Sequence, residues 1–264
     1  MYGRYENIWK KMAEISAADA SDSSPSTDEK DARNGTTQTR KPPPVISLAM
    51  LRRAIGDEIA SLDVNEVTRR VYEGVLLKDD EKQGQKDQAQ PYIHKYWVDR
   101  KLNRNCLMVL ASALSITWGN DSQYWTKPEE EESCYSGNVN LPIAVLRGVW
   151  WLEIKGKCKT IVLSPRTMYE VTIVVKMSSR NHGWEIPVNL SLELPDGNKQ
   201  GRMERLDRLE KELWIPISIG KFETTPKTVG EISFSLTQTD GHWKSGLRVK
   251  GVVFTPTTEN KQPT

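Results

Sequence analysis

The sequence predicts a mainly β protein, in which a jelly-roll β-sandwich follows a short helical and partly disordered N-terminal region. Apolar and polar residues alternate in many short segments beyond residue 92, and this period of two is typical of half-buried strands. Before residue 92 the apolar spacing is helical or the composition is too polar for a core. Turn sequences between the alternating segments favour antiparallel strands packed as a sandwich.

The first 45 residues are expected to be disordered, apart from a short helix of low stability over residues 2–15. Residues 16–44 are nearly all small, polar or charged, and they end in three prolines. A segment of this composition buries too little apolar area to offset the entropy lost on ordering.

Residues 46–91 are predicted to hold two short helices and a polar linker over residues 78–91. Apolar residues recur at helical spacing from Leu48 to Leu62. Asp63 followed by Glu66 resembles a capping box, so a second helix is expected to begin there. The apolar side chains expected on this second helix are Val67, Val71 and Val75.

Residues 92–258 are predicted to form the sandwich, and residues 259–264 a short tail. The expected strands share the alternation of side chains and cover residues 106–118, 144–155, 169–177, 188–194, 213–219, 232–236 and 247–253. Residues 195–198 (PDGN) are typical of a hairpin turn. Pro216 indicates an edge strand, because proline cannot donate a hydrogen bond to a neighbour.

Composition restricts the class of protein. The 264 residues include 37 Lys and Arg against 35 Asp and Glu, a net charge of +2, which excludes a strongly basic nucleic-acid-wrapping protein. The sequence shows no secretory signal, no apolar run of about 18 residues and only three cysteines. We therefore expect a cytoplasmic protein without a membrane span. Cys134 follows the acidic residues 129–132, a predicted solvated loop, and is expected to be the most exposed cysteine.

The sequence contains no recognisable catalytic motif. There is no Gly-x-Ser-x-Gly, no Gly-x-Gly-x-x-Gly and no phosphate-binding loop. His94, His182 and His242 are far apart, and no Cys-x-x-Cys occurs, so a zinc site is not expected. The prediction is a binding protein that is not an enzyme, with no catalytic residue, no metal and no cofactor.

Tryptophan is unusually frequent, with 9 Trp against 3 Phe. In residues 114–125 a strand is expected to end at Trp118, a turn-rich loop follows, and Tyr124 and Trp125 come next. Two indoles flanking one surface loop form a platform for the apolar face of a pyranose ring, whose hydroxyl and acetamido groups need polar partners. Packing of either tryptophan in the core is an equally good interpretation.

Several motifs follow one another in a fixed order from residue 93 to residue 256. They are YWVD at 96–99, SITW at 115–118, QYW at 123–125, WLEIKGK at 151–157, GEISF at 230–234 and HWKSGL at 242–247. This series resembles the plant Nictaba-like lectin domain, and it is most similar to phloem protein 2 and its A-type relatives.

The resemblance implies a jelly-roll lectin of the plant cytosol, nucleus or phloem sap that binds N-acetylglucosamine oligomers and N-glycan cores on glycans or glycoproteins. Trp118 and Trp125 match the two sugar-stacking tryptophans of that family, and Glu231 matches a glutamate that contacts the sugar. Gln238 aligns with a second acidic position, a departure in which the amide still hydrogen-bonds a hydroxyl. The tryptophans assigned to packing are Trp150, Trp151, Trp184, Trp214 and Trp243.

A competing interpretation follows from the same resemblance. The chain would then be a phloem structural or RNA-carrying interaction protein in which sugar binding is secondary, with RNA or phloem proteins as partners. Association of two copies into a homodimer is also left open. Under the lectin interpretation, residues from about Pro91 onward are expected to fold and bind sugar without the N-terminal third.

Overall fold

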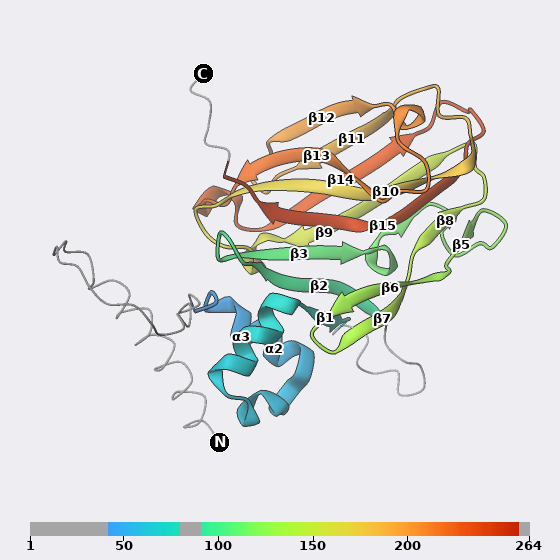
Figure 1. The fold of residues 1–264 in the computed structure, drawn as a ribbon. Coiled ribbons are helices and arrows are strands. Elements are labelled where there is room, and N and C mark those ends of the chain that lie inside the picture. The colour runs from blue at the N-terminus through green and yellow to red at the C-terminus, as the bar shows by residue number, and fades with distance from the viewer. Residues whose placement is uncertain (1–41, 80–90, 259–264) are drawn as a thin grey trace, which may run out of the picture.

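The computed structural model describes residues 42–79 and 91–258, which form helices beside a two-layered β structure (Figure 1). The disorder and the first helix expected before residue 42, most of the polar linker and the tail lie outside the described residues. In the described part of the chain, no helix is long and apolar enough to cross a membrane.

Two α-helices and a short 3-10 helix precede the sheets. They are α2 (Ile46–Ile55), η1 (Gly56–Ser61) and α3 (Val64–Glu73). The cap predicted at Asp63 is confirmed, because its carboxylate accepts a hydrogen bond of 2.8 Å from the Glu66 amide. The helix ends sooner than predicted, since Gly74 adopts φ +99° and Val75 already belongs to a strand.

The larger sheet has eight strands and is antiparallel throughout. Its main path runs β1-β2-β3-β15-β10-β13, β8 adds to β15, and β5 adds to β8. These strands are β1 (Val75–Lys78), β2 (Tyr92–Asp99), β3 (Arg104–Leu110), β5 (Trp125–Thr126), β8 (Ala144–Leu146), β10 (Met168–His182), β13 (Ile215–Glu223) and β15 (Ser245–Pro256). The edge position predicted from Pro216 is confirmed, because β13 ends this path.

The smaller sheet has five strands in the order β12-β11-β14-β9-β4. They are β4 (Ser115–Ile116), β9 (Leu152–Lys159), β11 (Val188–Glu193), β12 (Lys199–Glu204) and β14 (Glu231–Gln238). The turn predicted at 195–198 joins β11 to β12, with Gly197 at φ +86°.

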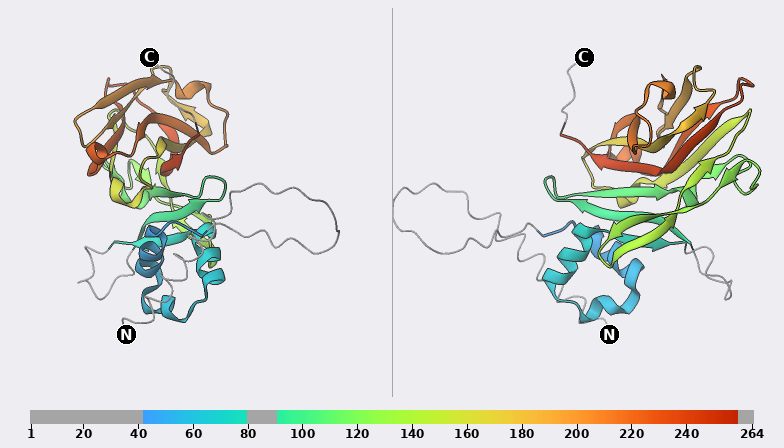
Figure 2. Two further views of the ribbon diagram at one scale, coloured as in Figure 1. Left: turned by 90° about the vertical axis from the view of Figure 1, so that its left-hand side faces the viewer. Right: turned by 45° about the vertical axis from the view of Figure 1, so that its right-hand side comes forward.

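The core lies between the two sheets. Alternate residues of β10 and β14 point inward and are almost fully buried, and the rings of Phe234 and Phe254 from the two sheets meet at 6.0 Å. The predicted mainly β class and jelly-roll sandwich are confirmed. Figures 1 and 2 show α2 and α3 beside β1 and β2, on the opposite side of the molecule from β12.

Two predicted strands are interrupted. The segment 106–118 divides into β3, the 3-10 turn η3 (Ala111–Ala113) and β4, while 144–155 divides into β8 and β9. In each case the chain leaves the larger sheet and enters the smaller one. An apolar run gives no sign of this change, because both pieces face the same core.

The acidic segment forms a strand, not the predicted solvated loop. β6 (Glu129–Cys134) pairs with β7 (Gly137–Pro142) as a hairpin, and Glu130 and Glu132 are its partly buried acids. Cys134, expected to be the most exposed cysteine, is buried, and so are Cys106 and Cys158. Pairing with Gly137 in the hairpin and a place in the apolar cluster of Leu76, Met108, Leu110 and Leu141 explain the burial of Cys134.

Candidate functional site

Four connections between the two sheets gather at one end of the sandwich. They lie where β9 and β11 begin and β14 ends, because Leu152 pairs with Gln238, and Asn189 with Thr237. We call this the crossover end, and β5 and β8 mark it at the right of Figure 1. Its connections are residues 117–124, 147–151, 183–187 and 239–244.

Trp118 opens the first of these connections and presents its indole to solvent. The side chain is 47% exposed, and its ring lies 5.2 Å from the Tyr124 ring at 35°. The backbone adopts φ +57°, a left-handed conformation that costs a non-glycine residue about 1–2 kcal/mol. We call this pair the Trp118–Tyr124 platform.

Hydrogen bonds at both ends hold the loop that carries the platform. The Thr117 amide donates to the Glu153 carbonyl at 3.0 Å, and the Arg147 amide donates to the Tyr124 carbonyl at 2.8 Å. The Thr117 hydroxyl also donates to the Glu153 carboxylate at 3.0 Å. Hydrogen bonds from Lys155 and Thr117 keep the pKa of Glu153 below its usual value, so this carboxylate is charged at neutral pH.

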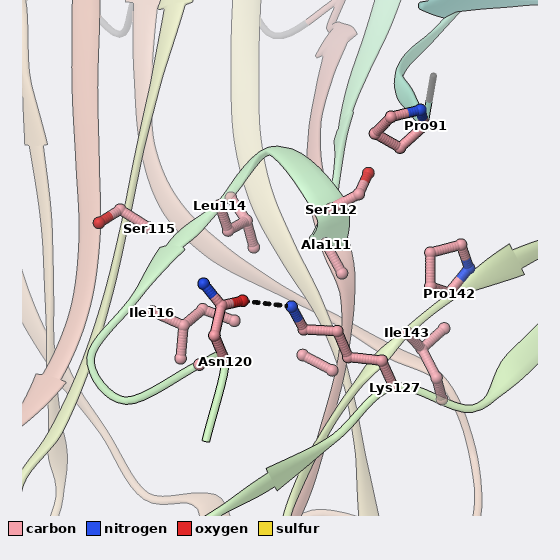
Figure 3. Close-up of a pocket in the computed structure, with 12 residues that line it drawn as sticks. Pro91, Ala111, Ser112, Leu114, Ser115, Ile116, Asn120, Lys127, Pro142 and Ile143 are labelled. Atoms are coloured by element: carbon pink, nitrogen blue, oxygen red, sulfur yellow. Dashed lines mark hydrogen bonds between the residues drawn. The ribbon is translucent and has the colours of Figure 1, made fainter. Parts of the chain in front are cut away.

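A cavity of about 500 Å³ lies beside the same loop (Figure 3). Ser115, Ile116, Gly119 and Asn120 line it from the loop side. On the other side Lys127 donates a 2.7 Å hydrogen bond to the Asn120 amide oxygen. The cavity combines an apolar wall with an amide, a hydroxyl and an ammonium group, which suits a partly polar ligand.

Trp125 and Gln238 lie in the interior. Trp125 is 3% exposed, and its indole N–H finds no acceptor among the described residues. The Gln238 side chain is 2% exposed and donates to the Ile186 carbonyl at 3.0 Å. In this conformation neither side chain presents a surface to a ligand, so both support the crossover end from within.

Glu231 lies at the opposite end of β14 from Gln238, where it pairs with Lys159 of β9. Seven residues at about 3.3 Å each put the two side chains about 23 Å apart along the strand. Glu231 forms a 2.7 Å ion pair with Lys157 and borders a second cavity, of about 430 Å³, near His94. The structure therefore does not bring the four predicted site residues together.

Three tryptophans assigned to packing are exposed, and that assignment is wrong for them: Trp150, Trp151 and Trp243. All three lie in connections of the crossover end. Trp184 is buried as predicted, and Trp214 is half-buried with its N–H donated to Glu130. The Asp240-Gly241 turn signal just before Trp243 could have revealed its loop position.

Metal-binding groups do not gather in the part of the chain that the structure describes. No set of three or more His, Cys, Asp or Glu side chains in residues 42–79 and 91–258 is placed to hold a metal ion. The groups available for binding at the crossover end are aromatic faces, amides, hydroxyls and paired charges.

Together these features define an antiparallel β-sandwich with an aromatic surface on the connections between its sheets. The chain belongs to the phloem protein 2 family, whose model matches residues 104–256, more than half of the sequence. This confirms the resemblance to phloem protein 2 found in the sequence. The match begins in β3, so the helices, β1 and β2 precede it.

The chain is much more similar in sequence to the plant relatives than to the solved structures. The Arabidopsis thaliana protein named PHLOEM PROTEIN 2-LIKE A1 is 38% identical over 211 residues, 79% of each chain. A lectin of Luffa acutangula is 39% identical over 164 residues, 61% of this chain and 76% of that lectin. Among solved structures, a xylan-binding domain of Paenibacillus barcinonensis is 13% identical with a TM-score of 0.34, covering 57% of this chain and 90% of that domain.

Proposed function

We propose that this protein is a lectin that binds N-acetylglucosamine oligomers and N-glycan cores at the Trp118–Tyr124 platform. The observation that carries the proposal is the exposed Trp118 indole, backed by the Tyr124 ring at 5.2 Å. Two family relatives are themselves named lectins, from Luffa acutangula and from Coccinia grandis, the latter 29% identical over 147 residues.

The backbone supports this role for Trp118. A residue held at positive φ keeps that conformation only where its surroundings fix it, and such strain is concentrated at functional positions. Here the Asp121 amide donates to the Trp118 carbonyl, and Thr117 and Tyr124 anchor the two loop ends. The indole is therefore oriented before a ligand arrives, which reduces the entropy lost on binding.

The polar groups around the platform match the rest of a sugar. A pyranose offers slightly positive C–H groups to the negative face of an indole, while its hydroxyl and acetamido groups need donors and acceptors. Asn120 and Gln123 supply amides next to the platform, and Glu153 supplies a charged acceptor. We propose that these residues orient the sugar by hydrogen bonds and that no catalytic step follows.

The test is calorimetric titration of chitotriose into the full chain and its Trp118→Ala variant. Losing stacking and apolar contact with one indole costs about 2 kcal/mol, which is a loss of roughly thirtyfold in affinity. Trp97→Ala is the matched control, because Trp97 lies on β2 beside Lys95 and away from the crossover end.

Far-ultraviolet circular dichroism establishes that each variant is folded. Unchanged affinity of folded Trp118→Ala would assign the sugar site to another surface. Strong binding of RNA or heparin by a parent that binds no glycan on an array would instead support the interaction-protein interpretation.

A further inference from the structure

The connection 147–151 lies alongside the loop that carries the Trp118–Tyr124 platform. The two segments are hydrogen-bonded at both ends, through Thr117 to Glu153 and through Arg147 to Tyr124. Trp150 and Trp151 occur between those two bonds. Their exposed indoles therefore belong to the same end surface as the platform.

Trp150 forms a second aromatic pair with Trp243 from the connection 239–244. The two rings lie 5.4 Å apart at 63°, and the side chains are 59% and 38% exposed. The Trp243 indole rests directly on Gly148, where an added Cβ would lie 2.0 Å from its Cζ2 atom. Glycine at 148 thus makes room for the ring and fixes its place.

Lys244 holds this pair in position from below. Its side chain is fully buried, and its ammonium donates to the carbonyls of Trp150 at 3.0 Å, His242 at 2.6 Å and Gln238 at 3.2 Å. Val149 and Lys244 also exchange backbone hydrogen bonds of 3.0 and 2.9 Å. A buried cation needs these acceptors, so the two connections are joined by a network that fixes both indoles.

The surroundings of the pair indicate what it binds. The exposed His242 imidazole and the Asp240 carboxylate lie 3.4 Å apart beside Trp243, and Glu153 follows Trp151 by two residues. Flat aromatic faces mixed with hydrogen-bonding groups suit a polyhydroxylated ring better than a purely apolar partner. Trp150 lies three residues beyond Arg147, whose amide donates to the Tyr124 carbonyl of the platform at 2.8 Å.

We propose that Trp150 and Trp243 form a second stacking subsite for the same oligosaccharide, continuous with the Trp118–Tyr124 platform, with Lys244 as its positioning residue. This inference rests on the proposed lectin function. A ligand that reaches both platforms is longer than one that covers the first alone. The crossover end therefore distinguishes longer from shorter oligomers by the number of platforms that each one reaches.

The experiment is calorimetric titration of the full chain with chitobiose, chitotriose, chitotetraose and chitohexaose. In the parent, affinity rises with length until both platforms are covered. Trp150→Ala loses about tenfold in affinity for chitohexaose, equivalent to about 1.4 kcal/mol, and less than twofold for chitobiose. Trp118→Ala weakens every length, which separates the first platform from the second.

Trp150→Ala is the principal variant, because Trp150 is the most exposed tryptophan of the crossover end. The substitution also keeps the backbone carbonyl that accepts the Lys244 hydrogen bond. Trp243→Leu is the second variant, since leucine keeps an apolar contact with Gly148 while removing the aromatic face. Ile161→Ala is the control for loss of an exposed apolar side chain at the opposite end of the sandwich, because Ile161 follows Lys159, the β9 partner of Glu231.

Each outcome has a distinct meaning. If the parent binds no chitooligosaccharide, the proposed function and this subsite both fail. If the parent binds but the Trp150 and Trp243 variants match it at every length, only the subsite is overturned. An equal loss at every length, or loss of self-association with unchanged glycan affinity, would also overturn it.

Discussion

Trp118 and Trp125 are seven residues apart in one motif, yet only the first presents its ring to solvent. Trp125 begins β5 and pairs with Leu146, which turns its indole into the core. Trp118 lies within the turn that follows β4, where the Gly119 amide donates to the Ile116 carbonyl, and its left-handed backbone fits a loop but not a strand. The sequence alone did not decide whether each indole faces solvent or the core, because the direction of the side chain depends on which sheet the flanking strand joins.

Glu231→Ala is expected to leave chitotriose affinity within twofold of the parent, because the ion pair with Lys157 lies at the far end of β14. Exposed pairs of this kind contribute little to stability. Titration checks the affinity, and chromatography of the same solutions should recover chitotriose intact from both proteins. A tenfold weaker affinity, or turnover that Glu231→Ala removes, would show that this carboxylate acts on the sugar.

At the scale of elements, the β6–β7 hairpin is held against the outer face of the larger sheet by ion pairs. Glu132 contacts Lys95 of β2 and Lys250 of β15, each at 2.5 Å. Glu130 contacts Lys176 of β10 at 3.2 Å. Although desolvation acts in the opposite direction, hydrogen bonds from Lys250 and Lys95 hold the pKa of Glu132 below its usual range. One strand of acids thus neutralises cations from three strands.

Glu132→Ala is expected to lower the free energy of unfolding by about 3 kcal/mol, because it leaves two partly buried ammonium groups without a counter-charge. The matched control is Glu131→Ala, which removes an outward-facing carboxylate from the same strand and should change stability by less than about 0.5 kcal/mol. Urea denaturation at neutral pH measures both variants. Equal effects of the two substitutions would contradict this account of the hairpin.

At the scale of the whole molecule, the N-terminal helices and the sandwich share one core. β1 pairs with β2 from Val75–Tyr96 to Leu77–His94. The helices and β1 contribute eight buried apolar side chains to the core cluster: Leu48, Met50, Leu51, Ile59, Val67, Val71, Val75 and Leu77. Residues 42–79 are thus an integral layer of the fold.

A chain that begins at Pro91 is therefore expected to be less stable than the parent by several kcal/mol, contrary to the expectation drawn from the sequence pattern. Each side chain it loses from the interface corresponds to about 1.5–3 kcal/mol of burial, against a total stability of about 5–15 kcal/mol. A chain that begins at Pro42 keeps both helices and is the matched control. Urea denaturation compares the three proteins. Equal midpoints would show that the sandwich is as stable without the helices and β1 as with them.

The period-two pattern was sufficient to predict five strands, because alternation of apolar and polar residues directly reflects the two faces of a strand. These strands are β10, β11, β13, β14 and β15. The same rule contains information about the site. Glu231 and Gln238 are an odd number of residues apart, so one continuous strand directs them to opposite faces. The aromatic pair of Trp150 and Trp243 could not be predicted, because its members are 93 positions apart in the sequence. Contacts formed only in the fold bring them together, including the Val149–Lys244 bridge and the hydrogen bond from Lys244 to the Trp150 carbonyl.

The grouping of the connections at one end places the proposed recognition surface outside the paired strands. The aromatic residues of the two proposed platforms lie outside the regular strands: Trp118, Tyr124, Trp150 and Trp243. Connecting segments tolerate substitution and insertion better than paired strands do. Ligand preference can therefore diverge while thermal stability stays constant, except at Gly148 and Lys244, where exchange would alter both properties together.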